Sequence, residues 1–264
     1  MTKSATREAA DEVSAPIASP SFTGNVGVGV TPEASYPDRP VVRVGSGLGL
    51  QCRATGNPSH TWINSNSYQD ASTAADKYIG TDQASQIKQT NGAFTFNVAP
   101  SGTADAAISW NTAMTIDNAG IVTKPLQPAF LAQGANGQNN IAVGSASIIL
   151  LPTERFDNNN DFSSNTFTAP VTGKYQLNSH VYLLQMPTNS SYFETYLVTS
   201  NKTYAGAITP SSYGGGGISY VSIEIAVLAD MDAGDTAFLR ISQGSGTQST
   251  DVHQNTAFSG YLVC

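Results

Sequence analysis

Apolar and polar side chains alternate along two long segments in the C-terminal half of the chain. In the first segment, one set of alternate positions holds Tyr175, Leu177, Ser179, Val181 and Leu183. In the second, the corresponding set holds Val221, Ile223, Ile225 and Val227. Successive side chains of a strand point to opposite faces, and β-branched residues favour strands. Both segments are therefore predicted to be strands with one face in a core.

Turn-forming residues separate these segments from their neighbours. Residues 172–173 precede the first segment and residues 232–235 follow the second. A further alternation of Ala237, Leu239 and Ile241 then ends at the glycines of residues 244–246. Short strands separated by regular turn signals are typical of a sandwich or jelly roll.

A third pattern of period two covers residues 42–54. Its even positions are nearly all apolar, whereas its odd positions carry glycine, arginine and glutamine. We expect one long strand here, with Gly45, Gly47 and Gly49 on its bare face, where another backbone could approach closely, as in an intertwined fibre. A nucleotide-binding glycine loop is disfavoured, because the glycines keep a period of two and no helical pattern follows them.

Two hairpins are predicted between these regions. Asn91 and Gly92 stand before the alternating Phe94, Phe96 and Val98, the usual signal for a two-residue turn with both central residues at positive φ. Residues 117–120 (DNAG), flanked by apolar residues on both sides, predict the second hairpin.

Three sequence blocks in the C-terminal half carry a family resemblance. They lie at residues 167–177 (FTAPVTGKYQL), 233–239 (AGDTAFL) and 258–262 (FSGYL). In this order and at these separations they resemble the complement-globular-head family. The resemblance implies a tumour-necrosis-factor-like jelly roll that assembles as a trimer and binds partners.

The N-terminal half carries a second, compositional resemblance. Residues 24–32 (GNVGVGVTP) and 114–125 (MTIDNAGIVTKP) are similar to segments of bacteriophage tail-fibre and other appendage proteins. We therefore expect an all-β, homotrimeric chain in three parts. Residues 1–20 would form an anchoring peptide with a short helix at residues 6–13, residues 21–125 a β-rich stem or small domain, and residues 126–264 a jelly-roll head.

Composition and charge agree with this class. Only 12% of the residues are charged and 24 are glycine, which suits turn-rich β-structure better than helix. The net charge of −7 disfavours a nucleic-acid partner, since binding to phosphates requires clustered lysine and arginine. The sequence has no apolar run of membrane-spanning length, so no membrane insertion is expected.

Residues 1–20 lack the apolar centre of a signal peptide, although heads of the resembled family are mostly extracellular. A virus particle that assembles in a host cytoplasm and is released by lysis reconciles these two observations. The expected localisation is therefore the virion, and other virion proteins are the expected partners of residues 1–20.

No enzymatic constellation emerges from the sequence. His60, His180 and His253 have no G-x-S-x-G serine nearby, and the acidic residues cannot be paired into a glycosidase site from sequence. We expect no enzyme activity and no cofactor. The segment between Asp157 and Asp161 (DNNND) favours a solvated loop over a calcium site but leaves a calcium ion open.

The two cysteines, Cys52 and Cys264, are not expected to form a disulfide, because they fall in segments assigned to different domains. Cys52 is instead predicted to be a small buried hydrophobic residue.

Strand parity yields candidate binding residues. The strand faces opposite the core positions carry too many aromatic side chains to remain exposed to solvent. In the resembled fold, neighbouring subunits contact one another through such a face. The predicted trimer-interface residues are His180, Tyr182, Tyr220, Glu224 and Tyr261, with His180 and Glu224 as hydrogen-bond partners. Receptor contacts are predicted at Tyr192, Tyr204 and Tyr213, since tyrosines recur in recognition surfaces, although lateral packing explains such residues equally well.

These observations lead to one expected function and two alternatives. The expected function is that of a trimeric viral tail fibre that attaches the particle, through its head, to a host cell-surface glycan or protein. The first alternative is a structural capsid or tail decoration protein without receptor binding. The second, a secreted recognition domain of non-viral origin, is opposed by the absent signal peptide.

Overall fold

The computed structural model describes residues 24–53, 60–134, 137–213 and 218–264. Its contacts divide the chain into two compact units, Met1–Pro125 and Leu126–Cys264. The described residues form strands and one short 3₁₀ helix, η1 (Pro210–Tyr213). The predicted anchoring peptide, with its helix at residues 6–13, lies outside the described residues.

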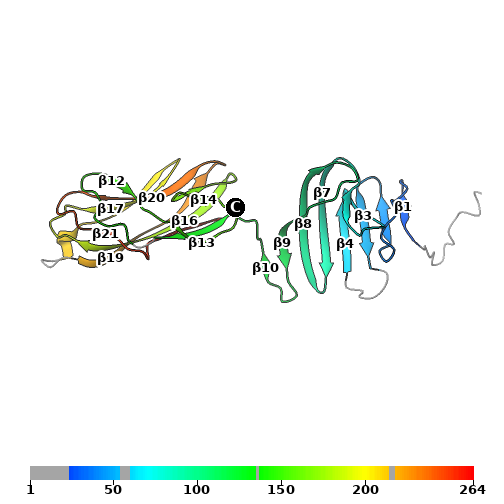
Figure 1. Cartoon of the computed structure of the whole chain (residues 1–264), viewed down its shortest axis with the longest axis horizontal. Coiled ribbons are helices and arrows are strands. Elements are labelled where there is room, and N and C mark those ends of the chain that lie inside the picture. Colours follow the sequence, from blue (N-terminus) through cyan, green and yellow to red (C-terminus); the bar gives the residue numbers. More distant parts are fainter. Residues whose placement is uncertain (1–23, 54–59, 135–136, 214–217) are drawn as a thin grey trace, which may run out of the picture. The chain divides into compact units, whose positions relative to one another are not determined.

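The N-terminal unit is built on one eight-stranded sheet (Figure 1). The strand order is β1 (Val26–Val28), β2 (Val41–Val44), β3 (Leu48–Cys52), β4 (His60–Ser65), β7 (Asp82–Thr90), β8 (Ala93–Gly102), β9 (Asn111–Ile116) and β10 (Val122–Thr123). Strand β1 pairs with β2 in parallel, and the remaining pairs are antiparallel. A small separate hairpin consists of β5 (Ser67–Gln69) and β6 (Asp76–Tyr78).

The prediction of one long strand over residues 42–54 is wrong. The chain folds back between Val44 and Leu48, so β2 and β3 form an antiparallel hairpin. The reason is backbone freedom: Gly45 has φ of 60°, a conformation that glycine adopts without steric cost. The three-residue turn preserves parity, so the apolar positions of both strands still share one face, with Val42 opposite Leu50.

Both predicted hairpin turns are confirmed. Asn91 and Gly92 connect β7 to β8 with φ of 52° and 80°, as a two-residue turn requires. In the second hairpin, between β9 and β10, Gly120 has φ of 84°. The Asp117 carboxylate accepts hydrogen bonds from the backbone amides of Ala119 and Ile121 and so fixes this turn.

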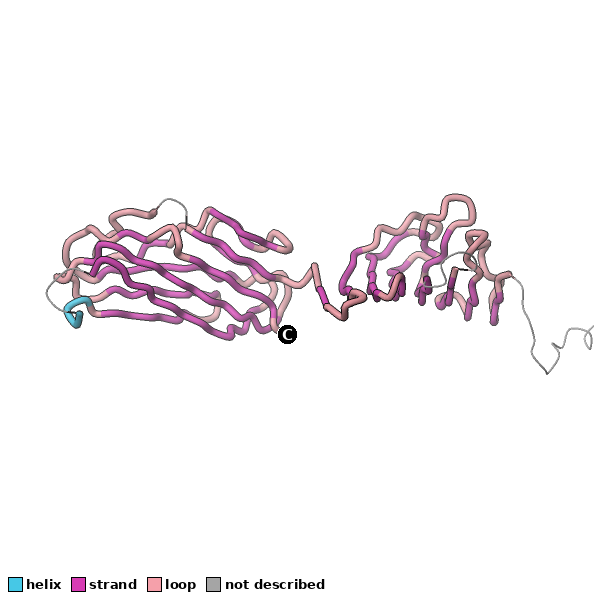
Figure 2. Tube along the Cα trace, turned by 90° about the horizontal axis from the view of Figure 1, so that it is seen from below, coloured by secondary structure: helices cyan, strands magenta, loops and turns pink. Residues whose placement is uncertain are grey.

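One face of the N-terminal sheet buries polar side chains. A chain of side-chain hydrogen bonds, here called the polar ladder, crosses five strands through Gln51, Asn64, Gln86, Asn97 and Thr112, with distances of 3.0–3.4 Å. The loops of this unit gather mostly on one side of its strands (Figure 2). They cover the polar ladder, because residues of these loops line a cavity together with Gln51 and Asn64.

The C-terminal unit is a sandwich of two sheets (Figures 1 and 2). The first sheet has the order β13 (Thr153–Asp157), β11 (Ala129–Gln133), β22 (Ala257–Leu262), β16 (Gly173–Met186) and β19 (Ile218–Met231), and β21 (Asp251–Val252) also pairs with β16. The second has the order β14 (Phe162–Ser163), β15 (Thr166–Thr168), β20 (Thr236–Gln243), β17 (Phe193–Thr199) and β18 (Thr203–Ile208), and β12 (Ala146–Ile148) also pairs with β20.

The core of the C-terminal unit lies between these two sheets. Phe130 stacks on Phe162 and Phe167 with ring centroids 5.1 and 4.6 Å apart and meets Phe258 edge-on at 5.0 Å. The core-facing assignments of the sequence hold, since Tyr175, Leu177, Val181, Leu239 and Ile241 are completely buried. The expected all-β chain, with a β-rich N-terminal part followed by a jelly-roll sandwich, is confirmed.

Candidate assembly and binding surfaces

The first sheet of the C-terminal unit has a second face that points away from the core. Strands β16 and β19 pair along their whole length, and burial alternates along both. On β19, Tyr220 is 60% exposed and Leu228 is 57% exposed, whereas Ile223 and Ile225 between them are buried. Successive side chains of a strand must alternate in this way. We call the outward side of this sheet the outer face.

The strand register places the outward residues in rows across the sheet. Glu224 lies opposite His180, which lies opposite Ala257. Because the strands are antiparallel, the next row consists of Ala226, two residues after Glu224, and Asn178, two residues before His180. The row after that joins Leu228, Gln176 and Tyr261, and Tyr261 is 49% exposed. Side chains of three strands therefore form one continuous surface.

Aromatic rings cluster at one end of the outer face. Tyr182 and Tyr220 stack with their ring centroids 5.8 Å apart, and His253 approaches Tyr182 edge-on at 5.0 Å. The ring of His180 lies 6.0 Å from that of Tyr182. Parity thus brings together three of the predicted interface residues, His180, Tyr182 and Tyr220. His253, which the sequence analysis considered only as a candidate catalytic residue, joins the cluster because β16 pairs with the strand beside it.

Two cross-strand pairs carry the charge on this face. His180 Nδ1 lies 3.1 Å from Glu224 Oε1, which confirms the predicted hydrogen bond between these residues. Lys174 Nζ lies 2.5 Å from Asp230 Oδ1. Opposite charges on directly paired residues stabilise a sheet modestly. Both acids therefore have a partner within their own chain: Asp230 pairs with the charged Lys174, and Glu224 is hydrogen-bonded to His180.

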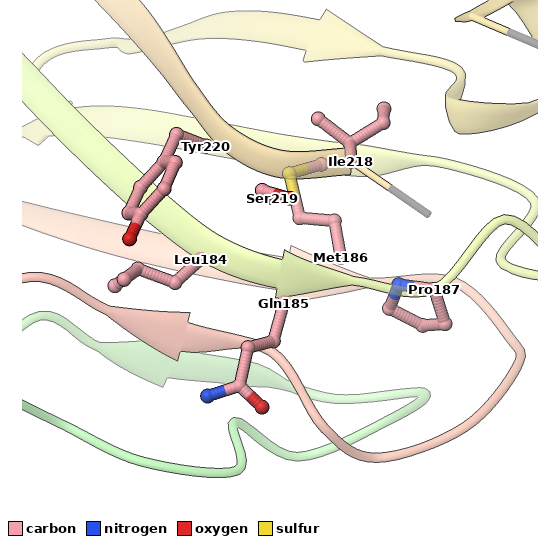
Figure 3. Close-up of a pocket in the computed structure, with 7 residues that line it drawn as sticks. All are labelled: Leu184, Gln185, Met186, Pro187, Ile218, Ser219 and Tyr220. Carbon is pink, nitrogen blue, oxygen red and sulfur yellow. The ribbon is translucent and has the colours of Figure 1, made fainter. Parts of the chain in front are cut away.

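A hollow of about 510 Å³ lies where β16 ends and β19 begins (Figure 3). Tyr220 and Leu184 occupy one part of it, and Met186 and Ile218 face each other in another (Figure 3). Gln185, which has φ of 53°, turns its amide away to donate a hydrogen bond to Asp251. The hollow therefore adjoins the outer face at Tyr220 and has both apolar and polar residues in its lining.

The three predicted receptor-binding tyrosines lie in different environments. Tyr192 is 40% exposed in the loop before β17. Tyr204 lies on β18 opposite Leu197, packs against the core and has Lys202 Nζ 5.3 Å from its ring. Tyr192 and Tyr204 are thus separated by about 17 Å along the strand direction, at 3.3–3.4 Å per residue. Tyr213 ends η1, and its side chain lies outside the described residues.

The acidic segment after β13 forms a tight turn. Both carboxylate oxygens of Asp157 accept backbone hydrogen bonds, one from Asp161 at 3.0 Å and one from Phe162 at 2.8 Å. Burial raises the pKa of the Asp161 carboxyl. Among the residues that the structure describes, no three His, Cys, Asp or Glu side chains converge as a metal site would require.

Cys52 and Cys264 are both free thiols, and both are exposed. The prediction that Cys52 is buried is wrong, because it lies on the apolar face of the N-terminal sheet, the face that the unit leaves open to solvent.

Sequence reasoning missed several apolar residues of the outer face. Leu228 has the same parity as Tyr220 and Glu224, so the alternation could have identified it. Phe156 is 49% exposed on β13 and lies opposite Leu131. The alternation along the chain does not show that Phe156 belongs to this sheet. The strand order shows it, since β13 and β19 form the two edges of the same sheet.

In the described part of the chain, no helix has the length and apolar character needed to span a membrane.

Comparison with known proteins addresses the C-terminal unit. No curated protein matches the chain. Among solved structures, the globular domain of zebrafish complement 1qA protein is 15% identical, covers 52% of this chain and 98% of its own, and has a TM-score of 0.39. Murine APRIL at pH 8.5 is 10% identical, covers 52% of this chain and 99% of its own, and has a TM-score of 0.38.

The family model of the C1q domain matches residues 129–263, just over half of the 264-residue chain. This span contains both sheets of the sandwich and the whole outer face. The chain belongs to the C1q domain family.

Proposed function

We propose that the protein is a trimeric appendage of a virus particle, a tail fibre whose C-terminal head attaches the particle to a host cell surface. The observation that carries this proposal is the outer face, which presents Tyr220, Leu228 and Tyr261 to solvent. Monomeric proteins seldom expose large contiguous apolar patches, and such patches usually mark interaction sites.

The family supports assembly into trimers. C1q and tumour-necrosis-factor-like domains are often trimeric and bind partners. In this chain, the outer face has properties of a subunit interface, since aromatic residues are enriched in such contacts, Asp230 pairs with Lys174, and Glu224 is hydrogen-bonded to His180. A threefold assembly would place the outer faces of three heads around one axis.

The N-terminal unit supports the role of a stem. The two segments similar to appendage proteins both belong to its sheet: residues 24–32 contain the edge strand β1, and residues 114–125 contain the hairpin of β9 and β10. A stem of this kind would carry the head away from the particle, and residues 1–20 would anchor it to other virion proteins. The proposal assigns binding and no chemical reaction to the head.

Attachment would use loops at the rim of the head, where side chains remain free after the outer faces have met. Tyr192 is the strongest described candidate, because it is exposed and lies in the loop before β17, a strand of the other sheet of the sandwich. A tyrosine there can bury a large area with little loss of side-chain entropy.

The test is binding of fluorescent full-length protein to a panel of bacterial and animal cells. We expect saturable binding to one cell type, competition by unlabelled protein, and a loss of affinity for Tyr192→Ala while the trimer persists. A control variant, Ile121→Ala, changes an exposed apolar residue outside the head. Trimers that bind no cell but are found on purified particles would contradict attachment and support a decoration protein. A protein found on no particle would contradict the viral assignment.

A further inference from the structure

The N-terminal sheet reverses the usual placement of side chains. Its polar ladder is buried, whereas its other side, here called the apolar face, is left open by the described residues of the unit. Within that face, one row of directly paired residues crosses six strands. The row consists of Val42, Leu50, Ile63, Ile87, Phe96 and Met114.

The row is substantially exposed. Val42, Leu50 and Ile63 are 40%, 44% and 38% exposed, and the three residues that continue the row are half-buried. By contrast, the small buried hydrophobic cluster of this unit consists of Tyr78, Ala84 and Ala99. Two of these three buried residues are alanines, whereas the exposed row contains valine, leucine and isoleucine. Exposure of such large apolar side chains to water is unfavourable.

The unit cannot cover the apolar face with the loops that shield its polar ladder, because those loops lie on the opposite side of the sheet. Glu33 reaches Arg43 from such a loop, with Oε2 3.1 Å from Nη2, and Arg43 is only 2% exposed. Arg43 alternates with Val42 and Val44 along β2, so it marks the covered side. A cover for the apolar face must therefore come from outside the described residues of this unit.

The distribution of charge indicates which kind of surface can pack against the apolar face. Between β2 and β9, the described strand residues that share the face of the six-residue row are apolar or uncharged. The chain as a whole has a net charge of −7, so copies of it repel one another over most of their surface. A neutral, apolar face is the place where identical copies can meet without this penalty.

We propose that the apolar face packs against the same face of two further copies of this chain, so that three sheets enclose a common apolar core. This inference rests on the trimer proposed for the head. Once three heads associate, their attached N-terminal units are held at a high effective concentration, and a second interface forms at little additional entropic cost. A hollow of about 540 Å³ beside Val42, Leu50 and Ile63 provides space for side chains of a neighbouring copy.

A pair of matched thiol probes tests the proposal in the full-length protein. Cys52→Ser and Cys264→Ser remove the native thiols, and then either Ile63→Cys or Ile121→Cys supplies a single probe. Ile63 lies in the row, whereas Ile121 is 60% exposed in the turn before β10. We expect the probe at position 63 to react with maleimide roughly tenfold or more slowly than that at position 121, because a covered thiol reacts only during local opening.

A charged variant provides an independent measurement. Ile63→Asp should open the apolar face and increase the binding of an environment-sensitive apolar dye, while analytical ultracentrifugation still gives the mass of a trimer held by the heads. Ile121→Asp is the control and should change neither the dye signal nor the mass.

The outcomes distinguish this inference from the proposed function. A trimer in which both thiols react equally fast would overturn the covered apolar face and leave the head trimer intact. A monomer in which both react fast would overturn both. A monomer with a slow thiol at position 63 would show that another part of the same chain is the cover, which also overturns packing between copies.

Discussion

At the scale of single residues, Asp70 organises a loop beside the polar ladder. One of its carboxylate oxygens accepts hydrogen bonds from the amides and hydroxyls of Ser72 and Thr73, and the other pairs with Lys77 Nζ at 2.7 Å. The backbone N–H of Ala74 donates to the Asp70 carbonyl at 3.0 Å. This loop connects β5 to β6 on the covered side of the N-terminal sheet, so one acidic side chain helps to hold that cover.

These contacts make the contribution of Asp70 depend on pH. Lys77 first, and then Ser72 and Thr73, hold the pKa of the Asp70 carboxyl far below its usual 3.8. A depressed pKa in the folded state stabilises the protein fully above the unfolded pKa, and this stabilisation is lost as the pH falls from 3.8 towards the folded value.

We predict that Asp70→Asn lowers the stability of the N-terminal unit at pH 7 and that the difference from wild type shrinks below about pH 4. Urea unfolding of both proteins, followed across this pH range, measures the effect. Asp82→Asn is a suitable control, because the Asp82 carboxylate accepts a hydrogen bond from the amide of the next residue, Gln83, and lies away from the Asp70 loop. A difference that stays constant down to pH 2 would contradict the assignment.

At the scale of elements, β16 and β19 each serve two surfaces at once. Leu177 is completely buried in the sandwich core, whereas Leu228, on the neighbouring strand, is 57% exposed on the outer face. The two residues have similar chemistry but lie on opposite sides of the same sheet, because Leu177 pairs with Val227 and its neighbour Gln176 pairs with Leu228.

We predict that Leu177→Ala and Leu228→Ala have different consequences. Leu177→Ala should lower the free energy of unfolding by about 2–5 kcal/mol at every protein concentration, since it leaves a cavity in the core. Leu228→Ala should act mainly on association and therefore lower the unfolding midpoint only where trimers dissociate. Unfolding curves at several protein concentrations separate the two effects. Equal, concentration-independent losses would contradict an interface on the outer face.

At the scale of the whole molecule, the outer face should determine the assembly state. We predict that Tyr220→Asp shifts the protein from trimers towards smaller species. A buried aspartate without a partner typically costs about 3–5 kcal/mol, and threefold symmetry introduces it three times. Sedimentation velocity measures the distribution of species.

Tyr192→Asp is the matched control for this prediction, because Tyr192 is also an exposed tyrosine but belongs to the loop before the other sheet. It should remain trimeric. Trimers of Tyr220→Asp and Tyr261→Asp with undiminished stability would show that the outer face points to solvent.

Local pattern was sufficient for several parts of the structure. The positive φ values at Asn91 and Gly92 follow from the preferences of these two residues, and the burial of Leu177 and Val181 follows from the alternation of side chains along one strand. The hydrogen bond between His180 and Glu224 was predicted from strand parity and the resemblance to a known fold, and the register confirms it.

The sequence by itself therefore determined strands, turns and which residues share a face, because these depend on residues close along the chain. It did not determine which face is covered. The strand predicted over residues 42–54 is replaced by the hairpin of β2 and β3 because φ at Gly45 reverses the chain, and the apolar face of that hairpin is the open one. Likewise, Phe156 and Tyr261 join the same surface only through the strand order. Burial results from contacts between distant segments, so only the tertiary structure decided which surfaces remain available for assembly and binding.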